Sequence, residues 1–288
     1  MTSAGLSGGP TVLRILLGSQ LRRLREGRGI SAREAAESIR GSESKISRIE
    51  LGRNAVREID VADLLTLYGV NDPAEREQLL TLASQANRPG WWYRFNDILP
   101  PWFQAYIGLE EAAEAIRLYE PHFVPALLQT EAYATAVLAL GDIPRDEMER
   151  HVLLRKERQR RFADGQLRLW AILDEEALRR PVGDATVMRG QLEHLIAASE
   201  HPNLILQIIP RGTGGYAAPG TFSILRFPDD EMPDIVYVEQ LTSALYLDKR
   251  HEVDRYLLAM ERMSILALDP TATADLIRGI RKETGEPA

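Results

Sequence analysis

The chain of 288 residues carries a net charge of −7, with 44% hydrophobic residues, 27% charged residues and no cysteine. This composition is that of a globular protein, and the length favours two domains. It excludes disulfide bonds and a histone-like positive coat, and no apolar stretch approaches the ~20 residues of a membrane-spanning helix. The N-terminus lacks the pattern of a secretory signal, so the sequence predicts a cytoplasmic protein without membrane contact.

The charge is unevenly distributed along the chain. Residues 11–53 hold ten Lys or Arg and five Asp or Glu, a net charge of +5, so the remaining residues sum to −12. A basic patch on an acidic body attracts polyanions locally while it disfavours non-specific coating.

The N-terminal part predicts disorder over 1–10 and an all-α domain of five helices over 11–86. Leucines recur at spacings of three and four from Leu13 to Leu24, as on one apolar helix face. Ser31 with Glu34 forms a capping box that opens a short second helix. Ser42 caps a third helix, which buries its isoleucines and ends at Gly52. Two amphipathic helices follow over 58–70 and 72–86.

Residues 87–103 contain breakers and three of the four tryptophans, which favours a junction docked onto the second domain. Domain two is expected over 104–282, followed by a tail over 283–288. Helices dominate from about 109 to 162. Strand-like runs follow at 167–173, 204–210, 221–227, 235–239 and 244–247, with helices at 185–199 and 250–282. The fold class is therefore α+β: a five-helix domain, then a larger α+β domain with a small, mostly antiparallel sheet.

The second and third helices have the spacing of a helix-turn-helix, whose second helix lies in the major groove of DNA. Arg and Lys can donate to guanine, Ser can bond to bases or phosphates, and Glu can accept from cytosine. The alternative is that these side chains are only the solvated face of a helical bundle. The DNA-binding candidates are Ser31, Arg33, Ser42, Glu43, Ser44, Lys45, Ser47, Arg48 and Arg53.

The stretch "LRRLREGRGISAREAAESIRGSESKISRIELGR" resembles the DNA-binding domain of the phage-repressor, or XRE, class of transcriptional regulators. The resemblance implies a structural ion pair between Arg25 and Glu50 that locks helix one to helix three. Two residues depart from the class. Ala32 stands where a glutamine is usual, which removes an amide contact to phosphate, and Glu43 places a negative charge at the start of the recognition helix.

The resemblance extends to about Arg281 through "HFVPALLQTEAYA", "DEEALRRPVG", "QLEHL", "NLILQIIP", "TFSILRFPDDEMPDIVYVE" and "ALYLD". In this order they resemble actinobacterial XRE regulators with a large C-terminal domain of unknown function, also described as antitoxin-like. Ala126 replaces the glycine common in that family. The resemblance implies a small partner protein encoded nearby.

Other chemistry is less well supported by the sequence. The loop at 211–220 lacks the Lys-Ser/Thr of a phosphate loop, so a hairpin or covering loop is favoured over a lid. The five histidines are scattered and no nucleophile motif occurs, which predicts neither a metal, nor a cofactor, nor an enzyme. The carboxylates at 174–176 are better explained by a helix N-terminus, which acidic side chains stabilise, than by general acid/base catalysis. The basic helix at 150–161 is expected to be a solvated face, with a second phosphate or partner contact as the alternative.

Two hypotheses remain. The first is a sequence-specific, homodimeric transcriptional regulator that binds a pseudo-palindromic operator in double-stranded DNA, with a C-terminal domain for dimerisation, partner binding or ligand sensing. The second is an antitoxin-like interaction protein that sequesters a small partner and binds DNA only to regulate itself.

Overall fold

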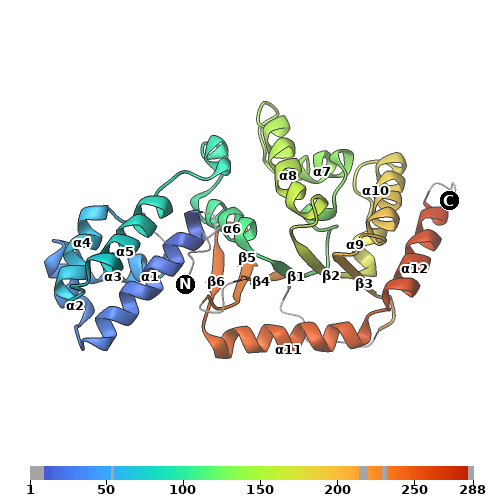
Figure 1. Ribbon diagram of the computed structural model, residues 1–288. Coiled ribbons are helices and arrows are strands. Elements are labelled where there is room, and N and C mark those ends of the chain that lie inside the picture. The colour runs from blue at the N-terminus through green and yellow to red at the C-terminus, as the bar shows by residue number, and fades with distance from the viewer. Residues whose placement is uncertain (1–9, 53–54, 214–219, 229–231, 285–288) are drawn as a thin grey trace. The chain divides into compact units, whose positions relative to one another are not determined.

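The computed structural model describes residues 10–52, 55–213, 220–228 and 232–284 (Figure 1). The chain forms two compact units, one reaching Ala112 and one beginning at Ala113. The sequence placed this boundary about one helix earlier, at 103. Each unit is described by itself below.

The first unit is helical, and its first five helices follow the predicted order. They are α1 (Pro10–Gly27), α2 (Ala32–Ser38), α3 (Glu43–Glu50), α4 (Glu58–Leu67) and α5 (Pro73–Ala86). Pro10, expected to be disordered, begins α1, while 1–9 lie outside the described residues. Asp72 caps α5 with Pro73 at its first position, the arrangement in which the missing proline N–H costs nothing.

The core of these helices consists of the predicted leucines and isoleucines. Leu17 and Leu21 of α1 are fully buried, as are Ile46 and Ile49 of α3. Helices α1 and α3 approach each other closely because Gly18 has no side chain: a Cβ there would lie 2.6 Å from the carbonyl oxygen of Glu50. Burial of this apolar surface fixes α3 on the unit while its other face stays exposed.

The tryptophan-rich segment belongs to the first unit. Trp91 and Trp92 lie in η1 (Trp91–Phe95), which contacts α6 (Pro101–Ala112), and α6 contacts α1. Trp91 donates from Nε1 to Glu111 of α6 at 3.0 Å. The sequence expected this segment on the second domain; the contacts instead join it to α6 and, through α6, to the helical unit.

The second unit contains a six-stranded sheet in the order β3-β2-β1-β4-β5-β6. The strands are β1 (Ala115–Glu120), β2 (Arg168–Asp174), β3 (Leu204–Ile209), β4 (Phe222–Arg226), β5 (Ile235–Glu239) and β6 (Ala244–Leu247). β1 pairs in parallel with β2, and β2 with β3, whereas β4, β5 and β6 add antiparallel pairs. The sheet is therefore mixed, and the expectation of a mostly antiparallel sheet was wrong.

The error has an identifiable cause. β1 lies inside 109–162, where the sequence predicted helices, so the parallel neighbour of β2 was missing from the count. Helices connect β1 to β2 and β2 to β3, and a crossover helix is the usual way for consecutive strands to run in parallel. The α+β class itself is confirmed.

Helices cover both faces of this sheet (Figure 1). α11 (Arg250–Leu266) runs along one face, where Val253, Met260 and Met263 pack against a cluster that includes Ile172 and Phe222. The other elements of the unit are η2 (Ala126–Leu128), α7 (Glu131–Leu138), α8 (Met148–Ala163), α9 (Glu175–Arg179), α10 (Ala185–Ala198) and α12 (Pro270–Glu283). In the described part of the chain, no helix is long and apolar enough to cross a membrane.

Candidate nucleic-acid interface

Helices α2 and α3 are joined by a tight turn, and a serine caps the N-terminus of each helix. The hydroxyl oxygen of Ser31 accepts from the Glu34 amide at 3.2 Å, and the Ser31 amide donates to Glu34 Oε2 at 2.8 Å. These hydrogen bonds lower the pKa of Glu34. Ser42 accepts from the Lys45 amide at 3.2 Å and starts α3. The Ser31 hydroxyl is therefore already used in the capping box. The phosphate contact predicted for Ser31 would have to replace one of these hydrogen bonds.

One face of α3 is buried and the opposite one is solvent-exposed. Ile46 and Ile49 face the core, and the exposed residues are Glu43, Ser44, Ser47 and Arg48. Arg48 donates from Nε to the Ser44 carbonyl at 3.2 Å, so its guanidinium lies back along the helix surface. This hydrogen bond leaves the terminal guanidinium nitrogens for another acceptor, and a bidentate contact to guanine needs two such donors.

Lys45 differs from its predicted role. Its Nζ lies 2.9 Å from Oδ2 of Asp60 in α4, and Arg57 lies 2.6 Å from the other carboxylate oxygen. Asp60 is only 2% exposed. The hydrogen bond from Arg57, followed by that from Lys45, holds the pKa of Asp60 below its usual value against the effect of burial. Lys45 therefore connects α3 to α4. The sequence predicted Lys45 on the DNA-reading face, because its partner Asp60 is fifteen residues away and no local pattern indicates the pair.

Arg25 and Glu50 form the ion pair that the resemblance implied. Arg25 donates from Nε and Nη2 to the two oxygens of Glu50 at 2.6 and 2.9 Å, and from Nη1 to the Ile30 carbonyl at 2.9 Å. Both side chains are mostly buried, 12% and 8% exposed. This bidentate geometry fixes the end of α1 to the end of α3.

The remaining candidates are distributed around these helices. Arg33 pairs with Glu37 on the exposed face of α2, and both side chains are well solvated. Arg53 lies outside the described residues. Arg40, which the sequence did not single out, occupies the turn itself with φ of +50°. Only its backbone conformation distinguishes it, so no sequence signal pointed to it.

Ion pairs inside the unit engage several of the ten cations counted in residues 11–53, although three of the partner carboxylates, Glu26, Glu37 and Glu50, are already subtracted in the net charge of +5. Arg22, Arg25, Arg33 and Lys45 have carboxylate partners, and Arg28 donates to the Gly69 carbonyl at 3.2 Å. The positive charge that remains for a polyanion therefore concentrates at fewer positions than the sequence indicated.

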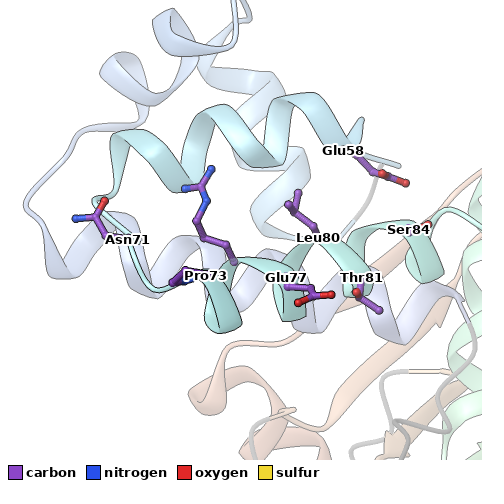
Figure 2. A pocket seen from close by; sticks show the side chains of 8 residues that line it. Glu58, Asn71, Pro73, Glu77, Leu80, Thr81 and Ser84 are labelled. Atoms are coloured by element: carbon purple, nitrogen blue, oxygen red, sulfur yellow. The ribbon is translucent and has the colours of Figure 1, made fainter.

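A groove of about 500 Å³ lies elsewhere in this unit, between α4 and α5. Figure 2 shows Glu58 and Glu77 at its rim, with Leu80 between the helices. Arg76 donates to the carbonyls of Val70 and Ala62 at 3.0 and 3.3 Å, so its charge holds α4 to α5. An acidic, open groove of this kind disfavours DNA, and it shares no residue with α3.

The candidate residues of the second unit make contacts within that unit. In the basic helix α8, Lys156 pairs with Glu131 at 2.6 Å and Arg160 with Glu157 at 2.7 Å. Arg155 donates to Gln129, and its burial lowers its pKa to about 10. The side chain of Asp174 caps α9 by accepting from the Glu176 amide. Within the described residues, no group of three or more His, Asp or Glu side chains could hold a metal ion.

A helical unit that buries one face of α3 and exposes the other, with capped helices on both sides of a tight turn, has the architecture of a helix-turn-helix DNA-binding protein. Residues 16–79 match the family model of a helix-turn-helix domain. Residues 103–279 match the model of a domain of unknown function, DUF5753, which covers more than half of the chain. The chain therefore belongs to the DUF5753 family, as a helix-turn-helix regulator with that domain at its C-terminal side. No curated protein and no solved structure matches it.

Proposed function

We propose that this protein is a sequence-specific transcriptional regulator that reads operator DNA with α3. The observation that carries the proposal is the exposed face formed by Glu43, Ser44, Ser47 and Arg48, held in place from behind by buried isoleucines and by the Arg25–Glu50 pair. A reading helix must be rigid, because base-edge hydrogen bonds tolerate little displacement. Non-catalytic function and a cytoplasmic location are part of this proposal.

Arg48 is the residue proposed to recognise a base. Its replacement by alanine removes a bidentate donor, so it should cost ~1 to 3 kcal/mol on the operator and relax the preference at one base pair. Arg53 is proposed to contact phosphate, so Arg53→Ala should weaken binding to all sequences alike. Fluorescence anisotropy on the DNA upstream of the gene and on a scrambled duplex, across a salt series, measures both effects. Equal losses for both variants on both duplexes would contradict this division of roles.

The second unit is proposed to bring two copies together, and the hairpin of β5 and β6 supports this role. β6 lies at the end of the sheet, and among the described strands only β5 pairs with it. Leu241 in the hairpin turn is 99% exposed, and Leu245 of β6 is 53% exposed. An edge strand with exposed leucines can add a further strand. A two-fold dimer requires half-sites about 34 Å apart or a multiple of that distance, which means a pseudo-palindromic operator.

The same edge also supports the alternative, an antitoxin-like protein of the XRE class that sequesters a small partner. The resemblance described for the sequence favours such a partner, and the acidic second unit suits a basic one. Native mass spectrometry distinguishes the two hypotheses. A homodimer supports the regulator, whereas a stoichiometric complex with the product of a neighbouring gene, which excludes DNA, supports sequestration.

A further inference from the structure

The turn between α2 and α3 contains a residue in an unfavourable backbone conformation. Arg40 has φ of +50° and is the only non-glycine residue with positive φ in the described part of the chain. Its amide donates to the Glu37 carbonyl at 3.2 Å, and the Gly41 amide donates to the Ala36 carbonyl at 2.8 Å. This is the hydrogen-bond pattern that closes a helix with a left-handed residue, a position usually occupied by glycine. An arginine there destabilises the fold relative to glycine.

Glycine would make the same two backbone hydrogen bonds without the strain, so they do not explain why an arginine occupies this position. The Arg40 side chain is exposed, and no described residue forms a hydrogen bond or an ion pair with it. Most neighbouring cations in the unit are engaged: Arg25 and Lys45 with carboxylates, and Arg28 with a carbonyl. A contact with a molecule outside the chain would supply an interaction that compensates for the strain.

The position of Arg40 identifies the kind of molecule. It stands two residues before the Ser42 cap, where the chain enters α3, and α3 is the helix proposed to lie in the major groove. In that docking the helix before the reading helix crosses the phosphate backbone, so a residue at the junction of α2 and α3 would lie beside phosphates. The guanidinium is a planar, permanently charged donor that matches two phosphate oxygens.

We propose that Arg40 is a phosphate-binding residue of the DNA interface, and that its strained backbone is retained for this contact. The inference rests on the proposed DNA binding. It adds a residue that the sequence pattern did not indicate, and it replaces Lys45, which is held in an ion pair with Asp60, as the cation at the start of the reading helix. Because phosphate contacts carry no sequence information, Arg40 should contribute affinity and not specificity.

The test compares Arg40→Gly with Arg40→Lys and with a control, Arg88→Gln, in the full-length protein. Arg88 is also exposed and lies just beyond α5. Anisotropy is measured on a 30-base-pair duplex of unrelated sequence and on the upstream DNA, across a salt series. Thermal unfolding of each variant is measured in parallel.

Arg40→Gly should lower affinity for both duplexes by the same factor and reduce the magnitude of the salt slope by about 0.9, the value of one phosphate contact. Its unfolding midpoint should rise by roughly a few degrees, because glycine relieves the strain. Arg40→Lys should keep the slope without the gain in stability, and Arg88→Gln should leave the slope unchanged.

A wild-type slope for Arg40→Gly, or an equal reduction for Arg88→Gln, would overturn the proposal while leaving the proposed function intact. A wild-type protein that binds neither duplex would overturn the proposed function and the role of Arg40 with it. A drop in both stability and affinity for Arg40→Gly would also contradict the argument, because the strain would then not exist.

Discussion

Removing Arg25 should destabilise the first unit far more than removing a nearby arginine that also has a carboxylate partner. Replacing Arg25 by methionine leaves Glu50, whose side chain is 8% exposed, without its partner. An uncompensated charge at such a site costs ~3 kcal/mol or more, and loss of the bond to the Ile30 carbonyl adds to it. Arg22 pairs with Glu26 at 2.8 Å, but both side chains are about half exposed, so Arg22→Met should cost ~0 to 1 kcal/mol.

The measurement is urea unfolding followed by tryptophan fluorescence in a Trp170→Phe background. Trp170 is the one tryptophan of the second unit, so the remaining signal reports the first. With a slope of ~1.5 kcal/mol per molar urea, Arg25→Met should lower the midpoint by about 2 M and Arg22→Met by about 0.7 M or less.

A double variant, Arg25→Met with Glu50→Leu, adds a second comparison. It removes both charges, so it should recover at least ~1 kcal/mol of the loss, because an apolar pair of similar volume no longer leaves a buried charge. Equal midpoints for Arg25→Met and Arg22→Met would refute the reasoning that burial makes the Arg25–Glu50 pair important. A double variant less stable than Arg25→Met would refute the role assigned to the unpaired carboxylate.

Three further predictions concern other parts of the chain. Asp60→Asn should destabilise the first unit at neutral pH, because the lowered pKa of Asp60 makes its carboxylate a source of stability that is lost as pH falls below about 3.8. The same substitution frees Lys45, so it should raise the affinity for DNA of any sequence. An unchanged affinity in fluorescence anisotropy would contradict this. Gly18→Ala should force α3 away from α1. Alanine favours the helix more than glycine does, but the clash should still leave the unit less stable by ~1 kcal/mol. A higher urea midpoint would show that α1 and α3 do not approach each other this closely. Burial, with a smaller effect of Glu239, raises the pKa of Glu120 to about 8, so the folded state holds a proton that the unfolded state releases. The stability of the second unit should therefore fall as pH rises from about 4.5 to 8. Glu120→Gln should flatten this dependence in urea unfolding followed by the Trp170 signal, taken as the difference between proteins with and without Trp170→Phe, and parallel curves would refute it.

Local features of the helix-turn-helix were visible in the sequence because their causes lie within a few residues. The capping box at Ser31 and the buried isoleucines of α3 depend on spacings of three. The role of Lys45 was not visible, because a basic residue on an exposed helix face looks the same whether or not a buried carboxylate from another helix lies beside it. Arg40 was not visible either, since only backbone geometry distinguishes a left-handed turn residue from an ordinary one.

The sheet shows the same limit on a larger scale. "AIRLYE" carries Arg117 in its middle and Glu120 at its end, so it lacks the apolar run of a central strand. Its position between β2 and β4 comes from pairings with residues 168–173 and 222–226, far along the chain. Strand directions depend on those connections, which is why the fold class could be predicted and the parallel pairs could not.

This central place of β1 has a consequence for how the chain is made. Helices α1 to α5 pack against one another, with the most extensive contact between α1 and α5, so this bundle can close once α5 has been synthesised. β1 leaves the ribosome soon after them, but β4, its second neighbour, is synthesised about a hundred residues later. We therefore expect the DNA-binding helices to fold during translation while β1 still has open edges. In that interval the new chain can already bind DNA. The edges of β1 stay unpaired until β2 and then β4 are synthesised, and unpaired strand edges can pair with other chains and aggregate.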